Sequence, residues 1–148
     1  MSGGFFTFHK SVIGYRHINE KIPCQDSSVS YTVDDGSLQI IAVGDGHGDP
    51  ACHRSAKGSE FAVSIAEKCL KEFGKAIIAG EMDFTSPRRR RECIEQLTNT
   101  IILKWNEAIH NDLLENEIND NDLREAGSYE AAYREGSRLE HLFGTTLI

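Results

Sequence analysis

The sequence predicts an α+β fold in which an antiparallel β-hairpin is followed by two long amphipathic helices. Three observations support this prediction: polarity alternates over 27–43 around a short turn, the apolar period becomes helical after residue 55, and a Ser-Pro pair at 86–87 starts a second helix. The chain has 148 residues, of which 39% are hydrophobic and 26% charged. It therefore has the size and composition of one globular domain.

Strands are expected first in the N-terminal third of the chain. Residues 5–12 and 27–33 alternate in polarity, with a polar stretch over 14–26 between them, and residues 38–43 form a more continuous apolar run. Asp34-Asp35-Gly36-Ser37 separates the last two strands, and its glycine tolerates the positive φ of a tight turn. This turn predicts that the two flanking strands pair in antiparallel orientation.

Two helices are expected next. From about Ser55 the apolar residues recur at helical spacing, and Gly80 ends the pattern. Ser86 is a favourable N-cap and Pro87 a favourable first helical residue, so a second amphipathic helix is predicted to begin there and to end after Leu113.

The last part of the chain has two segments of different character. Residues from about 116 to 138 are polar and low in β-branched residues, which predicts a surface excursion or a weak helix. Residues 142–148 turn apolar again and indicate the beginning of a further strand. Because the sequence stops on that strand, we expect the chain to be a fragment.

Composition and charge exclude several classes of protein. The 16 basic and 23 acidic residues give a net charge of −7, whereas a nucleic-acid-binding domain usually has a basic excess. No apolar run approaches the roughly 20 residues of a membrane span, and the N-terminus lacks the pattern of a secretory signal. The four cysteines show neither zinc-ligand nor disulfide-framework spacing. We therefore expect a cytoplasmic protein that binds neither nucleic acid nor membrane.

The run from Gly44 to Asp49 is the first candidate site. Asp45 and His47 are separated and followed by glycines, which leave backbone carbonyls such as that of Gly46 accessible. Carboxylate and carbonyl oxygens are the ligands that Mg²⁺ and Mn²⁺ prefer, and a histidine nearby can donate a proton near neutral pH. A polar turn with Asp45 as a helix cap explains the same spacing equally well.

A second carboxylate is expected beside the first. Asp26 precedes the first hairpin strand and Asp45 follows the second, so antiparallel pairing brings them together. Two carboxylates repel each other unless a cation or a shared proton lies between them, which favours a metal. The alternative for Asp26 is an ordinary turn-capping role.

Four motifs follow one another along the chain: His17 to Ser27, Val43 to Gly48, Arg54 to Ala62, and Gly144 to Leu147. Together they resemble the protein phosphatase 2C family, and most closely its bacterial-type branch. The resemblance implies a four-layer α-β-β-α sandwich, of which residues 1–148 would be the N-terminal part of a single phosphatase-like domain, with the C-terminal part absent. It also implies hydrolysis of phosphoserine and phosphothreonine in proteins by a metal-bound water, with two Mg²⁺ or Mn²⁺ ions as cofactors.

The resemblance also implies roles for individual residues. By motif match, Asp45 would bridge the two metal ions, the carbonyl of Gly46 would bind one of them, and Asp26 would support the metal-bound waters. His47 stands where the family has its general acid, which protonates the leaving oxygen of serine or threonine. Asp49 would support this loop.

Three departures from the family pattern are visible. Lys21 stands where many relatives have a phosphate-binding arginine, and a lysine binds phosphate only as a point charge; it is equally well explained as a solvated loop residue. Gln25 replaces a frequent glutamate and is assigned a supporting role. The family's other metal-binding aspartates lie downstream of the Gly-Thr-Thr motif, beyond Ile148.

Two other functions remain open. The chain could be a non-catalytic phosphatase-like domain that binds a phosphoprotein or another partner, which the replacement of arginine by Lys21 favours. It could also be a different metal-dependent hydrolase with an Asp-x-His loop, against which the other motifs speak. The expected partner is a phosphoprotein substrate, and unpaired strand edges predict that this chain alone self-associates.

Overall fold

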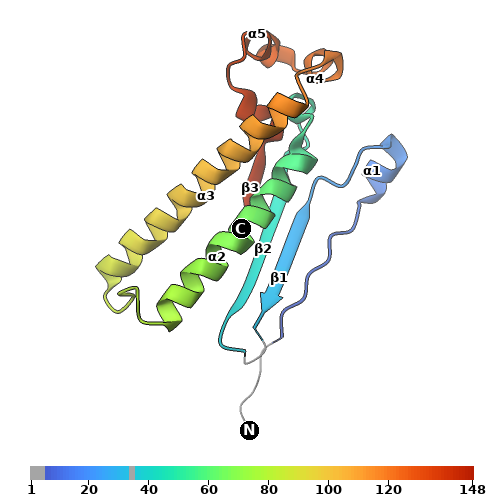
Figure 1. The fold of residues 1–148 in the computed structure, drawn as a ribbon. Helices are drawn as coiled ribbons and strands as arrows, with labels where there is room; N and C mark the ends of the chain where they lie inside the picture. The colour runs from blue at the N-terminus through green and yellow to red at the C-terminus, as the bar shows by residue number, and fades with distance from the viewer. Residues whose placement is uncertain (1–5, 34–35) are drawn as a thin grey trace.

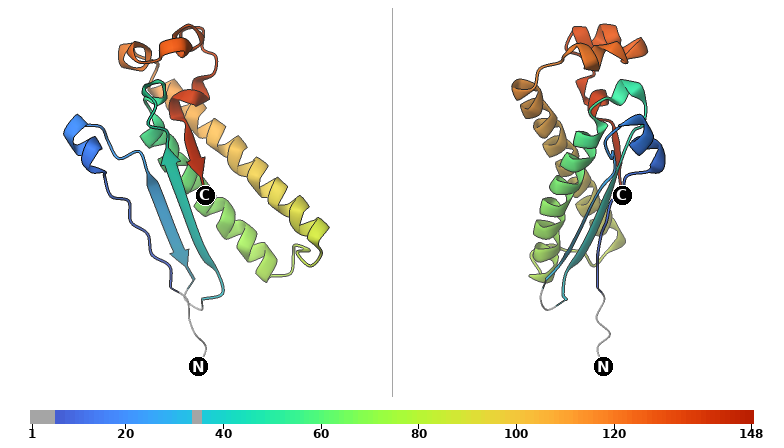
Figure 2. Two further views of the ribbon diagram at one scale, coloured as in Figure 1. Left: turned by 180° about the vertical axis from the view of Figure 1, so that it is seen from behind. Right: turned by 90° about the vertical axis from the view of Figure 1, so that its right-hand side faces the viewer.

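The computed structural model, which describes residues 6–33 and 36–148, contains a three-stranded antiparallel sheet with two long helices on one face (Figures 1 and 2). The strands are β1 (Ser27–Thr32), β2 (Gln39–Gly46) and β3 (Thr145–Leu147), in the order β1-β2-β3. The long helices are α2 (Ser55–Ile78) and α3 (Pro87–Glu115). Helix α2 contacts all three strands, and α3 packs against α2.

Short helices complete the described part of the chain. They are α1 (Tyr15–Glu20), α4 (Asp120–Arg124), α5 (Glu130–Arg134) and the 3₁₀ helices η1 (Pro50–Cys52), η2 (Gly127–Tyr129) and η3 (Leu139–Phe143). In Figure 1, α4 and α5 lie together at the end of the molecule where β2 ends. Helix α1 falls within the stretch over 14–26 for which the sequence predicted no helix.

The predicted hairpin is confirmed. Ser27 lies opposite Gly44 and Thr32 opposite Gln39, while Asp34 and Asp35 of the predicted turn lie outside the described residues. Strand β2 extends further than the sequence predicted, through Gly46, because β3 pairs with its last three residues. Asp45 therefore lies in a strand, whereas the sequence placed it in a loop.

The predicted strand over 5–12 is wrong for the residues described, since no strand is assigned between residues 6 and 14. This segment instead lies alongside β1 and is joined to it by side chains (Figure 1). The three hydrogen bonds are Thr7–Thr32 at 2.7 Å, His9–Ser30 at 2.9 Å and Ser11–Ser28 at 2.8 Å. Phe6 and Phe8 are 92% and 87% exposed, so the apolar side of the segment contacts little of the described chain. The alternation of polarity was correct, but no backbone ladder forms.

Both long helices begin where the sequence predicted. The Ser86 hydroxyl accepts a hydrogen bond from the backbone N–H of Arg89 at 3.2 Å, which caps the first turn of α3. One face of α2 is buried against the sheet in an apolar cluster built from Ala42, Val63 and Ala66. The apolar face of α3 is buried to a smaller extent than that of α2, since Ile94 and Ile102 are each 50% exposed.

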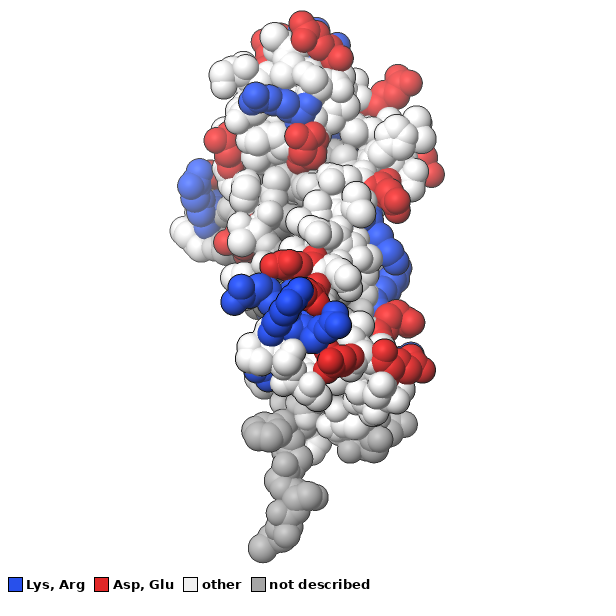
Figure 3. Space-filling model, turned by 90° about the vertical axis from the view of Figure 1, so that its left-hand side faces the viewer, with Lys and Arg blue, Asp and Glu red and all other residues white. Residues whose placement is uncertain are grey.

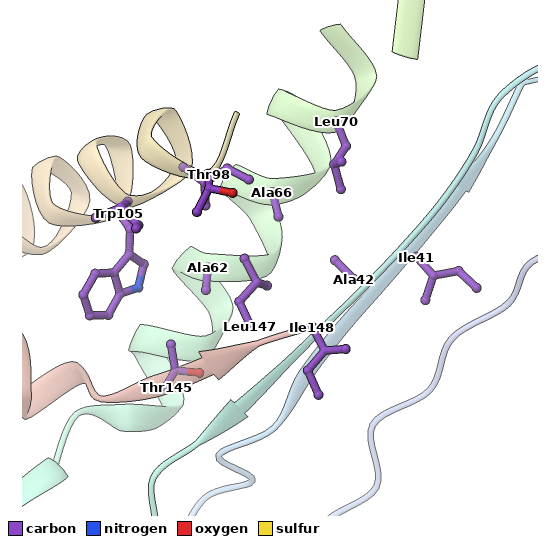
Figure 4. Close-up of a pocket in the computed structure, with 12 residues that line it drawn as sticks. Ile41, Ala42, Ala62, Ala66, Leu70, Thr98, Trp105, Thr145, Leu147 and Ile148 are labelled. Carbon is purple, nitrogen blue, oxygen red and sulfur yellow. The ribbon is translucent and has the colours of Figure 1, made fainter. Parts of the chain in front are cut away.

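An apolar pocket of about 500 Å³ lies between α2, α3 and the end of β3 (Figure 4). Ala62 and Ala66 line it from α2, Trp105 from α3, and Leu147 and Ile148 from the end of the sheet. None of its lining residues is titratable. The pocket therefore has no group for acid–base or metal chemistry.

The segment 116–138, for which the sequence predicted a surface excursion or a weak helix, contains the short helices α4 and α5 and has buried residues. The N-cap Asn119 forms a capping box with Asp122 at the start of α4. The second apolar core of the chain joins this unit to α3 and η3. Its buried members are Ile109, Ala126, Tyr133, Leu142 and Phe143, each 4% exposed or less.

The four-layer sandwich stays a prediction, because the described residues form one sheet and one helical layer. In the part of the chain that the structure describes, no helix is long and apolar enough to cross a membrane. Basic and acidic side chains lie next to one another on the face shown in Figure 3. The run from Arg88 to Arg91 follows this pattern, since Arg88 and Arg89 both pair with Glu92.

Candidate active site

Asp26 and Asp45 lie at the same end of the β-hairpin. The register pairs Ser27 with Gly44, and Asp26 directly precedes Ser27 while Asp45 directly follows Gly44. Both are exposed, and both line one open depression, whose wall on the other side is the segment from Phe8 to Val12. The structure therefore brings together the two carboxylates that the sequence predicted to be neighbours.

Strand β3 holds the end of β2 from the other side. The hydroxyl of Thr145 donates a hydrogen bond to the carbonyl oxygen of Asp45 at 3.0 Å, and the backbone N–H of His47 donates to the carbonyl of Gly144 at 2.9 Å. Thr146 lies opposite Asp45, and its hydroxyl is 3.5 Å from Nε2 of His47. The Gly-Thr-Thr motif thus borders the Asp-Gly-His motif directly.

Two glycines allow close approach at this junction. A Cβ on Gly46 would collide with the backbone carbonyl of Gln25. A Cβ on Gly144 would lie 2.7 Å from Nδ1 of His47 and 3.1 Å from Sγ of Cys52. Such contacts are shorter than packed side chains tolerate, so a larger residue at either position would displace its neighbours.

Gln25 connects the candidate site to the first turn of α2. Its Nε2 donates to the hydroxyl of Ser55 at 2.8 Å and lies 3.4 Å from the carbonyl oxygen of His47. Asp49 has a structural task, since it caps η1 by accepting a hydrogen bond from the N–H of Ala51 at 2.8 Å. The helix-capping role that the sequence analysis considered for Asp45 therefore belongs to Asp49.

Lys21 stands apart from these residues. It ends α1 in the left-handed conformation, with φ of 55°, and is exposed. It is not among the residues that line the depression of Asp26 and Asp45. The structure thus brings the two carboxylates to one depression, whose lining includes neither Lys21 nor His47; His47 follows directly after the end of β2.

The oxygen atoms at this site are of the kind that a divalent cation binds, but they are fewer than such an ion needs. Asp26 and Asp45 offer carboxylate oxygens, the ligands that Mg²⁺ and Mn²⁺ prefer, but these ions take about six oxygen ligands. Among the described residues, no group of three His, Cys, Asp or Glu side chains comes together as a metal site. Two carboxylates alone would supply only part of the ligand set of such an ion.

A buried ionic cluster, which the sequence analysis did not identify, lies beside the site. Arg54 donates from Nε to Asp122 at 3.0 Å and also to the backbone carbonyls of Asn116 and Glu117, at 2.7 and 2.9 Å. Burial works to raise the pKa of Asp122, but hydrogen bonds from Arg54 and from the backbone of Asn119 outweigh it and hold the pKa below its usual value. The cluster fastens the 116–138 unit to the segment after His47.

Tyr133 and His141 form a second connection, which was not predicted from the sequence. The hydroxyl of Tyr133 donates to the carbonyl of Ala51 at 2.9 Å and lies 2.8 Å from Nδ1 of His141. Sγ of Cys52 lies 3.8 Å from the same Nδ1. No sequence signal identifies this cluster, since its members are far apart along the chain and match no spacing motif.

The fold and site together define an α+β domain with paired carboxylates at one end of an antiparallel sheet and a histidine two residues after one of them. Residues 13–148 match the protein phosphatase 2C family, so the chain belongs to this family of protein phosphatases. No curated protein and no solved structure matches the chain.

Proposed function

We propose that the full-length protein is a metal-dependent phosphatase that hydrolyses phosphoserine and phosphothreonine in proteins. Membership of the family supports a phosphatase-type activity. Metal dependence is supported by one observation: Asp26 and Asp45 line the same depression, and His47 follows directly after the end of β2. Exposed carboxylates that face one depression are suited to hold a cation against a phosphate group.

Asp45, Asp26 and the carbonyl of Gly46 would hold Mg²⁺ or Mn²⁺, together with ligands that the family resemblance places downstream of the Gly-Thr-Thr motif. When bound, such an ion lowers the pKa of water and stabilises negative charge on phosphoryl oxygens. His47 is exposed beside these residues and would donate a proton to the leaving oxygen of the substrate.

The remaining predicted residues would act less directly. Gln25 orients the loop through its contacts with Ser55 and His47, and Asp49 holds the loop through Ala51. Lys21 would bind the phosphate group only if α1 moves toward the depression, because Lys21 lies outside the lining of the depression.

The proposal is tested by Mn²⁺-dependent release of phosphate from an aryl phosphate by the full-length protein. Asp45→Ala should reduce the rate by roughly 100-fold or more, since it removes a carboxylate ligand of the ion that would stabilise charge on the phosphoryl group. Glu95→Gln removes an acidic charge from the exposed surface of α3 and should leave the rate unchanged. Metal-independent activity, or full activity of Asp45→Ala, would show that the proposed reaction is wrong.

The alternative is a phosphatase-like domain that binds a phosphoprotein without turnover. Two observations favour it: Lys21 does not line the carboxylate depression, and the described residues supply only two carboxylates there. In that case the full-length protein would bind a phosphothreonine peptide with measurable affinity and release no phosphate with either metal.

A further inference from the structure

We propose that Tyr133 and His141 are positioning residues for His47, and that the folded 116–138 unit serves to hold the loop between β2 and α2. This inference rests on the proposed function, because it assigns His47 a reaction to perform. Neither residue touches the carboxylate depression, so both act through the backbone that carries His47.

The hydroxyl of the buried Tyr133 lies between two polar groups. Its side chain is 1% exposed, and its hydroxyl lies 2.9 Å from the carbonyl oxygen of Ala51 and 2.8 Å from Nδ1 of His141. A carbonyl oxygen can only accept, so the single hydroxyl proton points to Ala51. Burial raises the pKa of Tyr133 far above neutrality, which keeps this proton in place.

The hydrogen bond from Tyr133 to Ala51 determines the tautomer of His141. Because the hydroxyl of Tyr133 already donates to Ala51, it must accept a hydrogen bond from Nδ1–H of His141. The ring of Tyr129 stacks on the ring of His141, with centroids 3.9 Å apart and planes inclined by 14°, and so holds its orientation. His141 and Tyr133 thus form an ordered donor chain that ends on the carbonyl of Ala51, and the ring of Tyr129 packs against it.

Backbone hydrogen bonds connect Tyr133 and His141 to His47. Ala51 is held on both sides, since its N–H donates to Asp49 and its carbonyl accepts from Tyr133. A second connection runs from η3. The carbonyl of His141 accepts a hydrogen bond from the N–H of Gly144, and the carbonyl of Gly144 accepts one from the N–H of His47 at 2.9 Å. The backbone of His47 is therefore constrained from η1 and from η3 at once.

Gly144 lies where residues of η1 and η3 and His47 come closest together. The space around its α-carbon is filled by Nδ1 of His47, Sγ of Cys52 and the carbonyl of His141. A shift of η3 relative to η1 would therefore move the imidazole of His47. Proton transfer depends steeply on the placement of the donor, so such a shift should lower kcat more than it changes KM.

The experiment compares Tyr133→Phe with Tyr129→Phe in the full-length protein. The first change removes the hydroxyl that holds Ala51 and His141; the second removes a hydroxyl for which the structure describes no hydrogen bond, and keeps the stacked ring. Tyr133→Phe should lower kcat roughly 10- to 100-fold and change KM by less than about twofold. Tyr129→Phe should behave as wild type.

General destabilisation is separated from positioning by two further variants. Ile109→Val loosens the same apolar core without touching a hydrogen bond and should leave kcat unchanged. His141→Asn retains a side-chain N–H near the position of Nδ1 and should keep most of the activity, whereas His141→Leu should behave as Tyr133→Phe. This comparison also remains informative if Tyr133→Phe does not fold.

Hydrogen exchange tests the same inference without activity. In metal-free protein, Tyr133→Phe should speed exchange of the backbone N–H of His47 at least about tenfold, and Tyr129→Phe should not. If wild type lacks phosphatase activity, the proposed function fails, and the exchange result alone then decides whether His47 is held in this way. Wild-type kcat and unchanged exchange in Tyr133→Phe, or an equal loss of kcat in Ile109→Val, would overturn the inference.

Discussion

Asp26, which directly precedes β1, and Asp45, which lies in β2, face one depression at the end of the β-hairpin. Their carboxylates are exposed there, and the segment from Phe8 to Val12 forms the opposite wall. This arrangement follows directly from antiparallel pairing, and it underlies the metal-dependent function proposed for the protein.

The first prediction concerns metal affinity. Asp26→Asn keeps the size of the side chain but removes its charge, so it should weaken Mn²⁺ binding to the full-length protein roughly 10- to 100-fold. Isothermal titration with Mn²⁺ measures this directly. Equal affinity of wild type and Asp26→Asn would remove Asp26 from the site.

The second prediction concerns Gly144. Gly144→Ala places a methyl group 2.7 Å from Nδ1 of His47 and 3.1 Å from Sγ of Cys52. It should cost about 1–3 kcal/mol of stability and should displace His47. Gly14→Ala is the matched control, since a Cβ there meets nothing within 4 Å. Urea unfolding of both variants measures the difference, and equal stability would contradict the close packing described.

The third prediction concerns acid stability. The pKa of Asp122 is lowered in the folded protein, mainly because hydrogen bonds from Arg54 outweigh the opposing effect of burial. A carboxyl group with a lowered folded pKa stabilises the protein above its unfolded pKa of about 3.9, and this stabilisation is lost as pH falls through the folded value. Asp122→Asn should cost about 1–3 kcal/mol near neutral pH, because Arg54 loses the carboxylate of Asp122 and keeps only its ion pair with Asp112, at 3.5 Å.

The pH dependence itself distinguishes this explanation from a simple packing effect. Unfolding measured at several pH values should show the stability difference between wild type and Asp122→Asn shrinking below about pH 4. A difference that stays constant down to pH 2 would mean that the ionised carboxylate of Asp122 does not stabilise the fold.

The fourth prediction concerns self-association of the 148-residue chain. The sheet face opposite the helices exposes Ile41 and Val43, which are 56% and 38% accessible, and Ile148 is 81% accessible beside them. Exposed apolar strands of this kind promote association. Light scattering after size exclusion should show oligomers that Ile41→Lys reduces. A monodisperse monomer at high concentration would contradict the prediction.

Local patterns in the sequence were sufficient for the hairpin, for both long helices and for the position of Asp26 beside Asp45. Each depends on neighbouring residues: the alternation of the strands, the turn between them, and the Ser86-Pro87 helix start. The predicted strand over 5–12 failed because alternation reports which residues share a face, but not whether a backbone ladder forms.

The folded 116–138 unit could not be predicted for a different reason. Its residues are mostly polar, and its order depends on contacts with distant positions, such as Asp122 with Arg54 and Tyr133 with Ala51. Such pairs leave no periodic pattern in the sequence. The same holds for His141, which has no ligand spacing yet lies in a hydrogen-bonded cluster.

The most direct test of the central claim is phosphate release from a phosphothreonine peptide by the full-length protein, with and without Mn²⁺, in wild type and in Asp45→Asn. The account predicts Mn²⁺-dependent release by wild type, little release from a matched phosphotyrosine peptide, and a rate at least 100-fold lower in Asp45→Asn. No release by wild type in Mn²⁺, or equal rates in the two proteins, would contradict it.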